Sequence, residues 1–114
     1  MKVKEIKEII DGKIACGEEY LNYDISHAFA SDLMSDVLTI NSEKLALITG
    51  LTNLQTIRTS EMSDIYFIIF ARNKKVTEEM IKLAKSNRMV LLECPYSLYK
   101  TSGLLYLAGL KPIY

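Results

Sequence analysis

Three polar turns carry most of the side chains that could do chemistry, and each turn comes directly after an apolar run. The turns are Gly50-Leu51-Thr52-Asn53, Arg72-Asn73-Lys74-Lys75 and Cys94-Pro95-Tyr96-Ser97. Each turn precedes a segment with helical periodicity, where free backbone N–H groups and the helix dipole favour an anion. Arg72 and Lys74 could add charge-assisted hydrogen bonds to a phosphate or carboxylate, and Tyr96 could stack on a base. The turns therefore predict a site for an anionic or nucleotide-like ligand that comprises Gly50, Thr52, Asn53, Arg72, Asn73, Tyr96 and Ser97.

A purely structural interpretation of the same turns stays open. Thr52, Thr77 and Ser97 are residue types that cap helix N-termini, so their hydroxyls could serve the helices alone. Arg72 and the two lysines that follow it would then be solvated turn charges. No glycine-rich phosphate loop of the type GxxxxGKS/T or GxGxxG is present, so the turns do not carry a known phosphate-binding fingerprint.

Residues that commonly act in catalysis are few and lack a recognisable arrangement. His27 is the only histidine, and we assign it a structural or surface role. Asp32 and Asp36 are four residues apart, a spacing that places two carboxylates on one face of a helix. Such a pair can transfer protons or bind a divalent cation, but it more simply caps and solvates a short helix. We therefore expect no catalytic residue, no metal site and no cofactor.

The element that must position the turns is the uncharged run Ile65–Ala71, which is rich in β-branched and aromatic residues. A strand without a polar face needs helices above and below it. Two further apolar runs, Lys44–Gly50 and Met89–Glu93, are separated from it by segments with helical periodicity. This alternation is typical of parallel strands joined by right-handed crossovers. We predict an α/β fold, a three-layer sandwich with a mainly parallel central sheet of about five strands.

The remaining segments complete this sandwich. Four further elements are expected, at Val3–Ile10, Lys13–Cys16, Ile25–Ala30 and about 98–108. Four helices are expected to begin after N-caps at Ser31 or Asp32, Thr52 or Asn53, Thr77, and Ser97. In a sheet of this type ligands bind beyond the carboxyl ends of the strands, and the three polar turns would lie at that edge.

The last helix carries more aromatic and apolar surface than one sheet face needs. Tyr99 and Tyr106 are seven residues apart and so lie on nearly one face of that helix. They could pack in the core, or they could meet a partner, since tyrosine suits sites with one buried and one wet end. A small domain with a surplus apolar helix face often closes as a symmetric dimer. We therefore place Tyr99 and Tyr106 in a dimer or partner surface and expect a homodimer.

Composition limits the partners and the location. At 114 residues, the chain has room for one domain. Its 14 Lys and Arg residues balance 14 Asp and Glu residues, so no net field favours nucleic acid or an anionic membrane. No apolar run approaches the ~20 residues that span a bilayer. We expect a cytoplasmic protein without nucleic-acid or membrane partners, in which Cys16 and Cys94 are free and mostly buried.

Three parts of the sequence carry a resemblance to a known family, namely Phe29–Leu38, Leu47–Asn53, and Val90–Tyr99 with Ser102–Tyr106 after it. Together they resemble the DRTGG domain family. The similarity covers nearly the whole chain, so we expect a single stand-alone DRTGG-like domain over residues 1–114. The name-giving residues are absent, because Gly50-Leu51-Thr52 stands where the family often has Gly-Asp-Arg, and Ala71-Arg72-Asn73 stands where it has Thr-Gly-Gly.

The resemblance implies a fold similar to the N-terminal domain of HPr kinase/phosphorylase. Family members occur beside CBS modules, in phosphotransacetylases and in regulated pyrophosphatases, where the domain resembles a regulatory or dimerising module and not an enzyme. We therefore expect a non-catalytic regulatory or dimerisation module that binds a nucleotide-like or anionic ligand, a partner protein, or both. The alternative is a small enzyme or phosphate-handling protein that uses Arg72, Asn73 and either Asp32 or Asp36.

Overall fold

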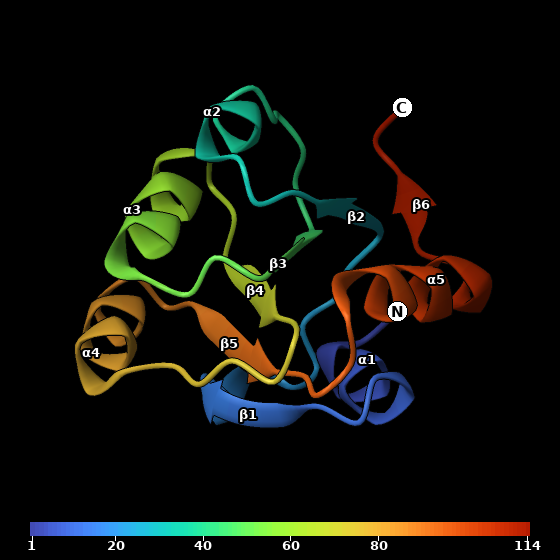
Figure 1. The fold of residues 1–114 in the computed structure, drawn as a ribbon, viewed down its shortest axis with the longest axis horizontal. Coiled ribbons are helices and arrows are strands. Elements are labelled where there is room, and N and C mark those ends of the chain that lie inside the picture. Colours follow the sequence, from blue (N-terminus) through green and yellow to red (C-terminus); the bar gives the residue numbers. More distant parts are fainter.

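One mixed sheet of six strands runs through the middle of the computed structural model, which describes residues 1–114 (Figure 1). The strands are β1 (Lys13–Cys16), β2 (His27–Ala30), β3 (Leu45–Thr49), β4 (Phe67–Phe70), β5 (Val90–Glu93) and β6 (Lys111–Pro112). Their order across the sheet is β1-β5-β4-β3-β2-β6. All neighbours are parallel except β1, which pairs antiparallel with β5. The prediction of a mainly parallel sheet is therefore confirmed.

Helices cover both faces of this sheet and make the molecule a three-layer sandwich. The helices are α1 (Val3–Ile9), α2 (Met34–Val37), α3 (Leu54–Met62), α4 (Glu78–Ser86) and α5 (Leu98–Ala108), with a short 3-10 turn, η1 (Glu18–Tyr20). Figure 1 shows α1 and α5 on one side of the sheet and α2, α3 and α4 on the other. The core is divided in the same way, into one apolar cluster beneath each helical layer.

The predicted central strand is β4, and its alternate side chains supply both clusters. Phe67 and Ile69 belong to the cluster under α1 and α5, whereas Ile68 and Phe70 belong to the cluster under α2, α3 and α4. All four residues are fully buried. A strand with period-two side chains can fill two cores only if both of its faces are apolar, and this is why the run contains no charge.

The predicted helix N-caps are confirmed for the three longer helices. Asn53 caps α3, Thr77 caps α4 and Ser97 caps α5, each by accepting a hydrogen bond from the backbone N–H three residues on. Each cap satisfies one of the backbone donors that a helix leaves free at its start. These caps also fix where the helices begin relative to the strand ends.

The short helix α2 departs from the prediction. Its N-cap is Leu33, whose apolar side chain cannot accept a hydrogen bond. Neither Ser31 nor Asp32 caps the helix. Asp32 therefore lies before the helix, and it does not stack on Asp36 along one helix face as the spacing suggested. The physical reason is that other donors compete with the helix for the Asp32 carboxylate. It accepts hydrogen bonds from Thr49, at the end of β3, and from Gly50, in the loop that follows.

Two other features complete the description. The edge strand β6 was not predicted, because it has only two residues and one is Pro112, a residue that gives no strand signal. Cys16 and Cys94 are both buried and unpaired, as expected. Burial raises the pKa of the Cys16 thiol, which keeps it protonated and unreactive. None of the helices has the length and apolar character that crossing a bilayer requires.

Candidate functional site

Asp32 joins the loops that follow β2 and β3 at the carboxyl edge of the sheet. Its Oδ1 accepts a hydrogen bond from the backbone N–H of Gly50 at 2.7 Å and another from Thr49 Oγ1 at 2.9 Å. The hydrogen bond from Gly50, followed by that from Thr49 and the charge of Arg72, lowers the pKa of the Asp32 carboxyl. Asp32 is therefore an ionised, fixed carboxylate within the predicted turn region.

Arg72 reaches across from the end of β4 to the same two loops. Its Nη2 lies 3.4 Å from the carbonyl oxygen of Gly50 and 3.7 Å from Asp32 Oδ2. The guanidinium covers Gly50 so closely that a Cβ at position 50 would overlap it. A side chain at position 50 would therefore displace the guanidinium, and glycine is what permits this approach.

The backbone after β4 is tied to the loop after β5. Arg72 and Asn73 have φ angles of 64° and 59°, in the left-handed region that costs a non-glycine residue about 1 kcal/mol. The backbone N–H of Arg72 donates to the carbonyl of Tyr96 at 2.7 Å, and that of Asn73 donates to the carbonyl of Cys94 at 3.0 Å. These two hydrogen bonds hold the strained turn, so the ends of β2, β3, β4 and β5 form one connected surface.

The structure brings the predicted ligand residues to this one edge, but several of their side chains already have partners. Asn53 and Ser97 accept hydrogen bonds as helix caps, and Thr52 Oγ1 donates to the carbonyl of Gly50 at 3.3 Å. Lys100 Nζ lies 3.9 Å from the centre of the Tyr96 ring, so one face of that ring is occupied. The side chains most available to a ligand are those of Arg72, which is 51% exposed, and Asn73, which is exposed and makes no side-chain hydrogen bond.

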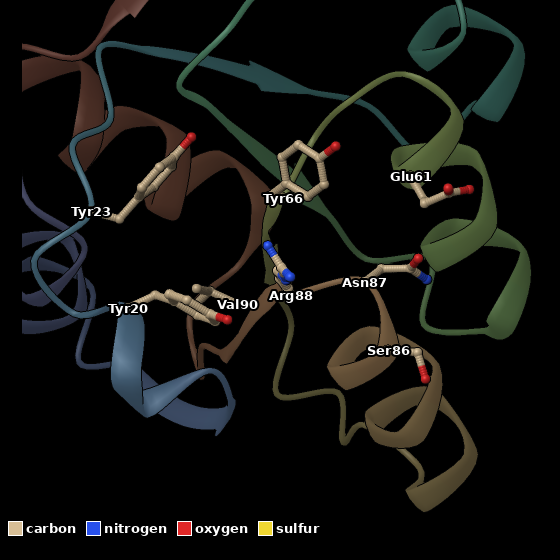
Figure 2. A pocket seen from close by; sticks show the side chains of 8 residues that line it. All are labelled: Tyr20, Tyr23, Glu61, Tyr66, Ser86, Asn87, Arg88 and Val90. Atoms are coloured by element: carbon tan, nitrogen blue, oxygen red, sulfur yellow. The ribbon is translucent and has the colours of Figure 1, made fainter.

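A second candidate site lies at the opposite, amino edge of the sheet. It is a hollow of about 510 Å³ between the starts of β4 and β5 and the ends of α3 and α4 (Figure 2). Eight residues line it, namely Tyr20, Tyr23, Glu61, Tyr66, Ser86, Asn87, Arg88 and Val90. Sequence reasoning missed this site because its residues come from three distant stretches of the sequence, 20–23, 61–66 and 86–90, which only the fold brings together.

The Tyr66 hydroxyl is fixed in this hollow by a hydrogen bond to Asp64 Oδ1 at 3.2 Å. Partial burial, followed by that hydrogen bond and the nearby carboxylates, raises the pKa of the Tyr66 phenol. Tyr66 therefore stays neutral at physiological pH, and because its proton is donated to Asp64, its hydroxyl oxygen can accept a hydrogen bond from a ligand.

A third, apolar groove of about 310 Å³ lies between α5 and the strands β2 and β6. Tyr99 and Tyr106 line it and are 89% and 68% exposed, so neither of them packs in the core. The core of α5 is supplied instead by Leu105, while Leu107 is exposed. This answers one question left open by the sequence, because the two tyrosines lie on the surface of the molecule.

The residues that the sequence offered for catalysis, His27, Asp32 and Asp36, do not lie together in the structure. Asp32 lies beside Arg72, but Asp36 makes no side-chain hydrogen bond or ion pair with either of them. His27 is half-buried at the start of β2, and its Nδ1 lies 2.8 Å from Ser26 Oγ. Of these charged candidates, only Asp32 and Arg72 contact each other at the carboxyl edge.

Among solved structures, the chain is similar to the CBS and DRTGG domains of the regulatory region of Clostridium perfringens pyrophosphatase, in complex with its activator diadenosine tetraphosphate. The superposition has a TM-score of 0.75 at 16% sequence identity. It covers 91% of this chain and 45% of that one, so this chain spans less than half of that relative. The sequence matches no protein family and no curated protein. The likeness supports a DRTGG-like fold.

Proposed function

We propose that this protein is a non-catalytic regulatory module that senses an anionic, nucleotide-like ligand at the carboxyl edge of its sheet. The ligand site comprises Gly50, Thr52, Asn53, Arg72, Asn73, Tyr96 and Ser97. Two findings support the proposal: the fold is shared with a regulatory region crystallised with a nucleotide activator, and the predicted site residues meet at one edge.

The observation that carries the proposal is the placement of Arg72. A guanidinium has five N–H donors, and in this structure one nitrogen approaches Gly50 and Asp32 at 3.4 and 3.7 Å. These long contacts leave donors for a phosphate or carboxylate, which forms shorter, charge-assisted hydrogen bonds. A ligand anion at Arg72 would weaken its contact with Asp32 and so change how the loops after β2 and β3 are tied to β4.

Two helices add to the attraction for an anion. The N-termini of α3 and α5 begin at Leu54 and Leu98, directly after the turns at this edge. Their first-turn N–H groups and dipoles favour negative charge. Tyr96 is half-buried against the apolar cluster under α1 and α5, and Lys100 lies over one face of its ring, so a base would stack on the part of the ring that stays exposed.

A thermal-shift measurement with nucleoside mono- and diphosphates and with pyrophosphate tests this site. At a ligand concentration about 100-fold above Kd, we expect Tm to rise by roughly 5–15 °C. The Arg72→Asn variant keeps a residue that tolerates a positive φ, and it should lose this rise. Lys44→Asn is the matched control, since Lys44 is an unpaired, exposed cation with φ 56°. Equal shifts in all three proteins, or none with any anion, would contradict the proposal.

Dimerisation through α5 is the second part of the proposed role. It rests on the exposed side chains of Tyr99, Tyr106 and Leu107 beside the apolar groove. A regulatory module can act by pairing the proteins that carry it, and a twofold pair of α5 helices would bury this surface. The same face could take a partner protein instead, which an unchanged monomer mass would favour.

The competing proposal is a small phosphate-handling enzyme, and the proximity of Asp32 to Arg72 is the observation that favours it. The lowered pKa of Asp32 would suit a base at neutral pH only weakly, because a more acidic carboxyl accepts a proton less readily. Release of phosphate from nucleotides, abolished in Asp32→Asn, would establish this alternative. Release no faster than that of the variant would exclude it.

A further inference from the structure

The hollow at the amino edge contains three tyrosines that the chain brings together from different elements. Tyr20 ends η1, Tyr23 lies in the following loop, and Tyr66 immediately precedes β4. Figure 2 shows these rings grouped around Arg88, with Glu61 and Asn87 on the opposite side. Aromatic rings around a hollow offer faces and edges for a planar ligand group, each pair contributing about 1 kcal/mol beyond its buried area.

The two charged side chains that line the hollow, Glu61 and Arg88, have no partner within the protein. The side chains of Glu61 and Arg88 make no hydrogen bond, and the three ion pairs of the structure all lie elsewhere. Both residues are exposed at the rim of the hollow. An ion pair between them would have neutralised the site, whereas their separation leaves one anchor for an anionic group and another for a cationic group.

The electrostatic balance of the hollow selects against a phosphate. Asp64 lies beside the hollow and accepts the hydrogen bond of Tyr66, so its carboxylate adds to the negative charge of Glu61, which lines the hollow. The C-terminal ends of α3 and α4 also adjoin the hollow, and helix C-termini carry partial negative charge. A dianionic phosphate would be repelled by this arrangement, while an ammonium group would be attracted.

We propose that this hollow is a second ligand site, for a zwitterionic aromatic molecule of the aromatic amino acid class. Arg88 binds the carboxylate of the ligand. One planar guanidinium is enough for this, because it can donate a hydrogen bond to each of the two carboxylate oxygens. Glu61 holds the ammonium group, and Tyr20, Tyr23 and Tyr66 contact the ring. The volume of about 510 Å³ lies within the range of small-molecule sites. The site is independent of Arg72, which lies at the other edge of the sheet.

Isothermal titration calorimetry of the full chain with L-tryptophan, L-tyrosine and L-phenylalanine tests the proposal. We expect saturable binding, weakened about tenfold or more in Arg88→Asn and in Glu61→Gln, since each loses a charged hydrogen-bond partner. Asparagine tolerates the φ of 58° at position 88. Lys44→Asn and Glu79→Gln are the matched controls, because both residues are exposed and neither lines the hollow. Circular dichroism of each variant separates lost binding from lost folding.

Two ligand analogues test the separate roles of the charges. Tryptamine lacks the carboxylate and indole-3-propionate lacks the amine, so each should bind about tenfold or more weakly than L-tryptophan. Equal binding of either analogue would overturn the assignment of the corresponding charged residue. No binding of any aromatic amino acid below about 10 mM would overturn the site as a whole. Neither result bears on the anion response that Arg72→Asn tests at the carboxyl edge.

Discussion

At the scale of single residues, Asp32 is a carboxylate whose ionised form contributes to the stability of the fold. Its pKa is lowered in the folded state, so its contribution to stability is present above the unfolded pKa, near 3.8, and is lost as the pH falls through the folded value. We expect Asp32→Asn to lower the free energy of unfolding by about 1 kcal/mol at neutral pH, since the carboxylate is half-exposed and screened. Urea unfolding at neutral pH and at about pH 3 measures the difference, which should be smaller at the lower pH, because protonation of the Asp32 carboxylate removes its advantage as the pH falls.

Asp36→Asn is the matched control for this measurement. Asp36 is an exposed carboxylate four residues away, and its side chain has no hydrogen bond or ion pair. Its replacement should change stability little at either pH. If Asp32→Asn and Asp36→Asn had the same effect at neutral pH, the hydrogen bonds from Gly50 and Thr49 to Asp32 would contribute nothing to stability.

The residues of the two candidate sites were predictable to very different degrees. The carboxyl-edge residues follow apolar runs directly, and parallel strands must bring such turns to one edge. Asp32 was assigned a helix-capping role because a sequence shows a nearby helix but not the competing donors of Gly50 and Thr49. The tyrosines and Arg88 of the amino-edge hollow gave no signal, since the fold alone places them together.

At the scale of elements, substitutions on the two faces of β4 test whether this strand is covered by helices on both sides. Ile68 and Ile69 point into opposite apolar clusters and are both fully buried. Ile68→Val and Ile69→Val should therefore each lower the free energy of unfolding, by about 1 kcal/mol, because each leaves a methylene-sized cavity. Urea unfolding measures both effects. A negligible effect of either substitution would mean that one face of β4 is uncovered.

The elements that the sequence predicted are those with strong periodicity or a strong cap. β3, β4 and β5 have apolar runs on both faces, and α3, α4 and α5 are capped by Asn53, Thr77 and Ser97. The weak elements were harder, since α2 has four residues and no side-chain cap, and β6 has two residues. Such short elements are held by tertiary contacts, which local sequence does not display.

At the scale of the whole molecule, the two proposed ligand sites lie at opposite edges of one sheet. β4 and β5 connect the two sites. Arg72 follows β4 at one edge, while at the other edge Tyr66 directly precedes β4 and Val90 is the first residue of β5. The helical layers leave the exposed face of α5 as a third surface, on neither of these edges. A module with this arrangement can bind ligands at its edges and a second copy on its flank without overlap.

Self-association through α5 is the prediction that belongs to the whole molecule. A stable pair buries about 800 Å² on each partner, and an aromatic residue at its centre contributes about 2 kcal/mol. Sedimentation equilibrium should therefore give twice the chain mass for the wild type, and Tyr106→Glu should weaken association about 30-fold. Met62→Glu is the matched control, because Met62 and Tyr106 are both 68% exposed but lie in opposite helical layers. A single-chain mass at every concentration, or equal loss in both variants, would exclude α5 as the dimer surface.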